Sequence, residues 1–195
     1  MNLDKVGNPL ALIRSDDPKL KNKVVSVFAN GEDDDDIKKP FRSLKLNGAS
    51  RFQPIGNWNL ERTTNYIVGA SGSGKSTYIA NWIKEYKKKY KDHPIYLFSV
   101  LKDDESIDAV KPSRILLDDQ FIRDPIDISI YANSCCVFDD CDSIPDKRLK
   151  DKVYQTLNLI ASTGRHHKIT LWCVSHTATD KGYTKTILNE AHTIT

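Results

Sequence analysis

The stretch with the clearest chemical potential is GASGSGKST, residues 69–77, in which three glycines precede a lysine, a serine and a threonine. Glycines let the backbone curl so that successive N–H groups point at one anion, and the N-terminus of a following helix adds the positive end of its dipole. Four of the positions match GxxxxGKS, the pattern of a phosphate-binding loop. The predicted nucleotide-binding residues are Gly69, Ala70, Ser71, Gly72, Ser73, Gly74, Lys75, Ser76 and Thr77.

Lys75 and Ser76 are expected to have separate tasks at this loop. Lys75 is placed to neutralise the β- and γ-phosphates as a point charge, which makes it a predicted catalytic residue. The hydroxyl of Ser76 is a suitable ligand for Mg²⁺, so Ser76 is a predicted metal ligand. The cofactors that follow from this chemistry are ATP and Mg²⁺.

A second reactive group is the acidic pair that ends the apolar run CCVFDD, residues 135–140. Asp139, at the end of the predicted strand, is placed to hold the magnesium ion through water. Asp140 is placed beside it to take a proton from an attacking water, and is a second predicted catalytic residue. Such a pair can also begin a solvated loop, but the phosphate loop earlier in the chain favours the catalytic interpretation. The guanine-reading stretch Asn-Lys-x-Asp, expected of a GTP-dependent switch, is absent from the sequence.

Two further polar residues, Ser175 and His176, follow the apolar run ITLWCV. Because the ends of parallel strands meet at one crevice, either residue could sense the γ-phosphate, and both are candidate catalytic residues. Arg165 precedes the same run and allows two interpretations. It could complement the dipole of a preceding helix, or it could act in trans by entering the ATP site of a neighbouring copy.

Apolar periodicity predicts the elements that must position these residues. Short apolar runs predict strands in TTNYIVGA, PIYLFSV, RILLDD, NSCCVFDD and KITLWCVSH. One predicted helix follows the phosphate loop, and its apolar face consists of Ile79, Trp82, Ile83, Tyr86 and Tyr90. A second lies in DKRLKDKVYQTLNLIAST, ends at Gly164 and has an apolar face of Leu149, Val153, Leu157 and Ile160. Strands that alternate with helices predict an α/β fold with a mostly parallel sheet.

The composition is that of a soluble globular protein of ordinary domain size. Of 195 residues, 39% are apolar and 28% are charged, and no apolar run is long enough to span a membrane. The N-terminus lacks the pattern of a secretory signal, so we expect an intracellular protein. The net charge of +3 is too small to indicate a nucleic-acid partner by itself. Without metal-ligand spacing, the four cysteines are predicted to be small core residues: Cys135, Cys136, Cys141 and Cys173.

Residues 1–55 are predicted to form an N-terminal extension, and residues 56–195 the core of the fold. The extension contains one strand candidate, VVSVFAN, and the acidic run 33–36, which we interpret as an exposed turn.

The basic run KEYKKKYK lies on the first predicted helix. Because Tyr86 and Tyr90 continue the apolar face of that helix, Lys87, Lys88 and Lys91 are predicted to form a solvated face rather than a grip on nucleic acid.

Together, GASGSGKST, CCVFDD and TGRHHKITLWCVSH resemble the FtsK/HerA superfamily of DNA-pumping ATPases. Within it they are most similar to the genome-packaging ATPases of large and membrane-containing double-stranded DNA viruses, the poxvirus-like packaging ATPases. The resemblance covers about residues 60–195. The phosphate loop is generic, whereas the double acid and the Arg-His pair before the last strand are more specific. In the family that strand usually ends in glutamine, where this chain has His176.

The resemblance implies a RecA-like P-loop NTPase core of the ASCE type, with helices on both faces of the sheet, and a DNA-stimulated ATPase. The implied partners are double-stranded DNA bound without sequence specificity, further copies of the chain in a ring, and capsid or portal-vertex proteins. A viral protein of this kind would reside in the host cytoplasm or in the virion. AHTIT resembles the start of the strand that follows the sensor helix, so the chain is expected to stop early within this core.

Three classes of function remain open at this stage. The first is a motor that hydrolyses ATP to move double-stranded DNA, packaging a viral genome into a capsid. The second is a small-molecule phosphotransferase, which should have an arginine-rich lid, whereas the stretch 101–134 contains only Arg114 and Arg123. The third is a regulatory or structural protein that binds ATP and hydrolyses it poorly.

Overall fold

The computed structural model describes residues 8–27, 50–57, 60–180 and 182–195. The acidic run 33–36 lies outside these ranges. The chain divides into two compact units, residues 1–59 and residues 60–195, and each is described by itself.

The first unit contains a small antiparallel sheet in the order β2-β1-β3. Its strands are β1 (Asn8–Arg14), β2 (Val24–Val27) and β3 (Arg51–Pro54). Ala11, Ile13 and Val25 are buried and supply its apolar core. The sequence predicted one strand here, which β2 confirms. It did not predict β3, whose four residues have mixed polarity, or β1, whose short apolar run lies between charged residues.

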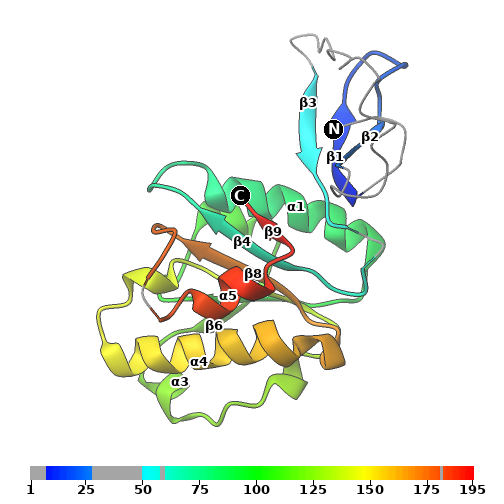
Figure 1. Cartoon of the computed structure of the whole chain (residues 1–195). Coiled ribbons are helices and arrows are strands. Elements are labelled where there is room, and N and C mark those ends of the chain that lie inside the picture. The colour runs from blue at the N-terminus through cyan, green and yellow to red at the C-terminus, as the bar shows by residue number, and fades with distance from the viewer. Residues whose placement is uncertain (1–7, 28–49, 58–59, 181) are drawn as a thin grey trace. The chain divides into compact units, whose positions relative to one another are not determined.

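The second unit is built on a six-stranded parallel sheet in the order β6-β5-β7-β8-β4-β9 (Figure 1). The strands are β4 (Thr64–Val68), β5 (Ile95–Ser99), β6 (Ser113–Leu116), β7 (Cys135–Phe138), β8 (Thr170–Ser175) and β9 (Thr193–Ile194). This sheet confirms the predicted α/β class, and each predicted strand of the core is present. Because all strands run in one direction, their carboxyl ends lie at one edge of the sheet.

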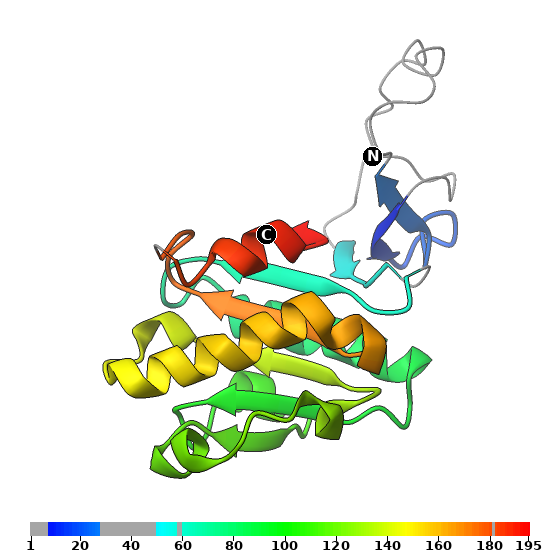
Figure 2. The same ribbon diagram turned by 60° about the horizontal axis from the view of Figure 1, so that its bottom comes forward.

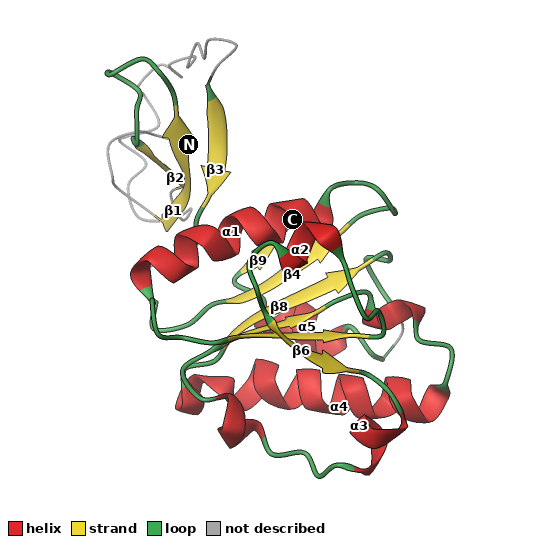
Figure 3. Ribbon diagram, turned by 180° about the vertical axis from the view of Figure 1, so that it is seen from behind, coloured by secondary structure: helices red, strands yellow, loops and turns green. Residues whose placement is uncertain are grey.

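Helices cover both faces of this sheet (Figure 3). The first face carries α1 (Lys75–Lys89) and α2 (Glu105–Asp108), which contact each other. The second face carries α3 (Asp119–Arg123), α4 (Lys147–Thr163) and α5 (Lys185–Glu190). The described residues of the unit also form short 3-10 helices, which are η2 (Ile128–Tyr131), η3 (Cys141–Ser143) and η4 (Gly164–His167). In the described part of the chain, none of the helices combines the length and apolar character needed to span a membrane.

The apolar face predicted for α1 packs on the sheet. Ile79 and Ile83 are fully buried, and Trp82 meets Trp172 of β8 edge to face, with ring centroids 5.3 Å apart. One prediction for this helix is wrong in part. Lys87 is half-buried rather than solvated, because its Nζ donates hydrogen bonds to the carbonyls of Lys91 and His93 and so holds the turn that follows the helix.

The apolar face predicted for α4 is also confirmed, since Val153, Leu157 and Ile160 are fully buried against the other face of the sheet (Figure 2). In the same layer the rings of Phe98 and Phe138, from neighbouring strands, stack with centroids 4.2 Å apart. The four cysteines are free and buried, which confirms their prediction as core residues. The ends of β4, β7 and β8 are thereby held in one rigid sheet.

Candidate active site

The phosphate loop, residues 69–74, joins the end of β4 to the start of α1. Gly74 caps the helix with a φ of 89°, a conformation that favours glycine. A Cβ at Gly69 would lie 2.5 Å from Ser73 Oγ, so the tight loop also excludes a side chain there. The loop therefore has the strand, turn and helix context that its sequence predicts.

The N-terminus of α1 differs from those of three other helices in the unit. Asp104, Asp118 and Asp146 cap α2, α3 and α4 with their carboxylates, which accept hydrogen bonds from the first backbone amides. The cap of α1 is Gly74, which offers no side-chain acceptor, and the first turn of α1 has no acidic residue. The amides at the start of α1 are therefore free of a competing carboxylate, as an anion site at a helix N-terminus requires.

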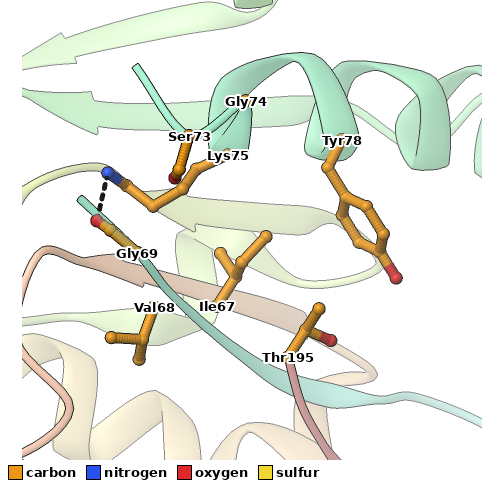
Figure 4. A pocket seen from close by; sticks show the side chains of 8 residues that line it. All are labelled: Ile67, Val68, Gly69, Ser73, Gly74, Lys75, Tyr78 and Thr195. Carbon is orange, nitrogen blue, oxygen red and sulfur yellow. Dashed lines mark hydrogen bonds between the residues drawn. The ribbon is translucent and has the colours of Figure 1, made fainter. Parts of the chain in front are cut away.

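Lys75 folds back over the loop (Figure 4). Its Nζ donates hydrogen bonds to the carbonyls of Gly69, at 2.9 Å, and Ala70, at 3.3 Å. The same Nζ lies 3.9 Å from Asp140 Oδ1, although Lys75 itself is only 8% exposed. The phosphate loop and the acidic pair therefore share one small space at the carboxyl edge of the sheet.

Asp139 and Asp140 follow β7 and have different environments. Asp139 is buried, and this desolvation, reinforced by the negative charges of Asp140 and Asp104, raises its pKa to about 7. Burial also raises the pKa of Asp140, against the attraction of His176 and Lys75. Asp140 has a φ of 49°, a left-handed conformation that aspartate adopts more readily than most residues other than glycine and asparagine.

The donor atoms at this edge suit a divalent cation. The carboxylate oxygens of Asp139 and the hydroxyl of Ser76 are hard ligands of the kind Mg²⁺ prefers. The pKa of Asp139 is raised first by burial and then by the charges of Asp140 and Asp104, and a bound cation would offset both effects by favouring the ionised carboxylate. The residues therefore fit the metal that the sequence predicts.

Of the two polar residues at the end of β8, His176 is the one that approaches the acids. Its Nε2 lies 3.4 Å from Asp140 Oδ2, and neither ring nitrogen makes a hydrogen bond within the described residues. Ser175 is fully buried, and its Oγ donates instead to the carbonyl of Thr177, at 2.9 Å. The hydroxyl of Ser175 thus stabilises the turn after β8.

Asp142 is a residue of this site that the sequence analysis missed. One ligand atom each from Asp140, Asp142 and His176 lies within 4.8 Å of the others. Burial acts to raise the pKa of Asp142, but hydrogen bonds from the amides of His176 and Thr177 and from the Thr177 hydroxyl act against it, and its pKa is lowered. Its position just after the acidic pair is the only feature of the sequence that could have indicated a role, because its hydrogen-bond donors follow β8, more than thirty residues further along the chain.

A pocket of about 260 Å³ adjoins the phosphate loop (Figure 4). Its walls are Ile67, Val68, Gly69, Ser73, Gly74, Lys75, Tyr78 and Thr195. Tyr78, from the first turn of α1, meets Trp172 edge to face with ring centroids 6.0 Å apart, which orients its ring beside the pocket. An apolar and aromatic wall next to a phosphate site can accept the base and ribose of a nucleotide. Neither Tyr78 nor Thr195 was predicted from the sequence.

Arg165 lies away from these residues. It is exposed on η4, which precedes β8, whereas His176 follows β8, so the two lie at opposite edges of the sheet. The last turn of α4 is complemented by Arg62, which donates to the carbonyls of Ile160 and Ala161. Arg165 is therefore not required as the partner of those carbonyls.

The sequence and fold of this chain were compared with those of known proteins. No known family model matches the chain. A protein of Sputnik virophage, described as uncharacterized protein V3, is 38% identical over 197 residues, which cover 100% of this chain and 76% of the virophage protein. The chain belongs to the Sputnik V3 family.

The fold of this V3 family member also resembles solved structures. The cytoplasmic domain of EssC matches with a TM-score of 0.53 at 16% identity, over 96% of this chain and 35% of that one. The pCW3 conjugation coupling protein TcpA, solved with ATPγS, matches with a TM-score of 0.50 at 14% identity, over 68% of this chain and 48% of TcpA. The chain thus spans about a third of the EssC chain and about half of the TcpA chain. These similarities confirm the RecA-like P-loop NTPase fold.

A third structure is the genome packaging NTPase B204 from Sulfolobus turreted icosahedral virus 2, in complex with AMPPCP. The match covers 69% of this chain and 74% of the B204 chain, at 14% identity and a TM-score of 0.46. This similarity is too low to support a conclusion.

Proposed function

We propose that this protein is an ATP-hydrolysing motor that translocates double-stranded DNA and packages a viral genome into a capsid. The observation that carries the hydrolytic part is the convergence of Lys75, Asp140 and His176 at the edge of the sheet that holds the phosphate loop. An open helix N-terminus, a cation beside it and two acids at the end of β7 are the parts expected of a site that hydrolyses a nucleotide.

The roles of the residues follow from their places. The loop amides and Lys75 would bind the β- and γ-phosphates, and Ser76 and Asp139 would hold Mg²⁺. Bound Mg²⁺ would neutralise charge on the phosphates. Asp140 is the base that takes a proton from water, because its carboxylate lies between the cation of Lys75 and the ring of His176.

The nucleoside part of ATP fits the pocket beside the loop. Tyr78 supplies an aromatic face, and Ile67 and Val68 supply apolar contacts. None of the described residues that line the pocket is acidic, so none would repel the phosphates.

DNA and oligomer partners follow from the resemblance of the sequence to the FtsK/HerA superfamily. In a ring of identical chains, Arg165 would enter the ATP site of the neighbour, and its exposure at the far edge of the sheet is compatible with that role. Capsid or portal-vertex proteins are the proposed docking partners, and the host cytoplasm or the virion the proposed location.

The arginine content of the stretch 101–134 favours the motor over a phosphotransferase. Arg114 is occupied by an ion pair with Asp108, at 2.5 Å, and by a hydrogen bond to the carbonyl of Leu101. It therefore braces the segment around α2 and is not free to close over a phosphate.

The experiment that tests the motor is an ATPase assay with duplex DNA of arbitrary sequence. We expect DNA to stimulate hydrolysis, and we expect most of the stimulation to disappear between about 50 and 200 mM salt, because contacts to phosphates release counterions. ATP hydrolysis by an assembled sample that does not respond to DNA at low salt would contradict translocation and favour a regulatory ATPase.

A further inference from the structure

The peptide group between Ser175 and His176 is hydrogen-bonded on both sides. Its carbonyl accepts a hydrogen bond of 3.2 Å from the backbone N–H of Gly69. Gly69 is the first residue of the phosphate loop. Its N–H donates to Asp142 Oδ2, at 2.9 Å, in the short helix η3 that follows the acidic pair. One rigid peptide plane thus connects the phosphate loop with the segment that carries Asp140.

The carboxylate of Asp142 holds more than this one amide. The same Oδ2 accepts from the backbone N–H and from the Oγ1 of Thr177, each at 3.1 Å. The sheet pairing of β8 ends at Ser175, so the next two amides need acceptors other than a strand. A single ionised oxygen that accepts three donors fixes the turn strongly.

The ring of His176 depends on this turn for its position. Neither ring nitrogen makes a hydrogen bond within the described residues, yet Nε2 lies 3.4 Å from Asp140 Oδ2. The backbone at positions 176 and 177, rather than a bond of the ring itself, therefore keeps the imidazole beside the acid. Asp142 holds that backbone.

The backbone of Asp142 is also held in place. Lys150, in the first turns of α4, donates from Nζ to the backbone carbonyl of Asp142 at 3.0 Å and pairs with Asp180 Oδ2 at 2.7 Å. The carboxylate is thus presented from an anchored segment and not from a free loop.

We propose that Asp142 is a positioning residue for hydrolysis, which locks the turn after β8 so that His176 faces Asp140. This inference rests on the proposed function, because it assigns Asp142 a task within the same site. It acts through His176 and the peptide plane, and it does not touch the nucleotide.

The test compares Asp142→Ala with Asp142→Asn. Asparagine keeps an oxygen that can accept the same donors, whereas alanine removes it. We expect Asp142→Ala to lower kcat about 10-fold, with the dissociation constant of ATP changed less than about 3-fold, and Asp142→Asn to retain most of kcat. In a His176→Ala background, Asp142→Ala should cause little further loss, because its effect passes through that ring.

A readout without turnover separates this inference from the proposed function. Amide hydrogen exchange at His176 and Thr177 should accelerate at least about 10-fold in Asp142→Ala but not in Asp142→Asn, while α1 stays protected. Thr177→Ala, which removes one of the three donors, should show a smaller change in both assays and serves if Asp142→Ala does not fold. If the wild type is inactive but shows the expected exchange pattern, the proposed motor function is contradicted, whereas the role of Asp142 in holding the turn is not. Unchanged exchange, unchanged kcat in an active enzyme, or an equal loss with and without His176 would overturn the positioning role.

Discussion

The ammonium group of Lys75 lies 3.9 Å from the Asp140 carboxylate, although the two residues follow strands that are not neighbours in the sheet. Lys75 also donates to the carbonyls of Gly69 and Ala70. A phosphate that enters the loop would compete for the same ammonium group. Under the proposed function, the ammonium group would exchange these carbonyls for phosphate oxygens and stabilise the transferred charge there.

The two acids should respond differently to substitution. Asp140→Asn should retain ATP and Mg²⁺ binding but lose turnover, because the amide cannot accept the proton of water. Asp139→Asn should weaken the magnesium-dependent part of ATP binding itself. Titration of ATP binding against magnesium for both variants distinguishes the two roles, and identical curves would show that the roles are divided wrongly.

Asp139 should also make the metal-free protein less stable as the pH rises. Its pKa of about 7 in the folded protein lies above the ordinary value of 3.8, so between these values the folded state binds the proton more tightly than the unfolded chain. The stabilisation from this proton is complete below about pH 4 and is lost as the pH rises through 7.

The variant Asp139→Asn removes this dependence, because asparagine does not titrate. At pH 8, without magnesium, we expect it to raise the free energy of unfolding by about 4 kcal/mol, and at pH 5 by about 2 kcal/mol. Urea denaturation at the two pH values measures the difference, with Asp119→Asn, an exposed aspartate, as the control. A variant that is equally destabilised at both pH values would refute the buried charge as the cause.

Tyr78 should contribute to nucleoside binding and not to phosphate binding. Replacing it by alanine removes an aromatic face beside the pocket, so ATP should bind about 10-fold more weakly while inorganic triphosphate binds as before. Tyr78→Phe keeps the ring and should bind ATP nearly as the wild type does. Calorimetric titrations with both ligands measure this, and equal losses for ATP and triphosphate would mean that the ring only supports the loop.

Arg165 should act between copies of the chain. Alone, Arg165→Ala and Lys75→Ala should both be inactive, but a mixture should recover some hydrolysis, because certain interfaces then pair an intact loop with an intact arginine. Arg123→Ala, at another exposed arginine, should remain active alone. Mixed oligomers that are demonstrated physically and still fail to recover activity would argue against a role in trans.

Periodicity and a short motif predicted most of the core. The helices α1 and α4 carry long apolar faces, and the phosphate loop has its own signature, so residues near in sequence were enough to identify them. The strands β1 and β3 could not be predicted in this way, because their burial depends on pairing within a small sheet and not on a local pattern.

The site was predictable at the strand ends but not in its supporting contacts. The sequence named both Ser175 and His176, and it could not decide between them, because the direction of each side chain depends on the pleat and on the turn after β8. Asp142 was missed because its three donors lie more than thirty residues further along the chain. Contacts of this kind depend on strand order, which no local pattern records.

The most direct test of the central claim is phosphate release from ATP and Mg²⁺ by the wild type and by Lys75→Ala. If the phosphate loop is the site of hydrolysis, the wild type turns over ATP, and removal of the ammonium group lowers the rate by at least about 100-fold while the fold is retained. A pure and folded Lys75→Ala protein that releases phosphate at the wild-type rate would contradict the account.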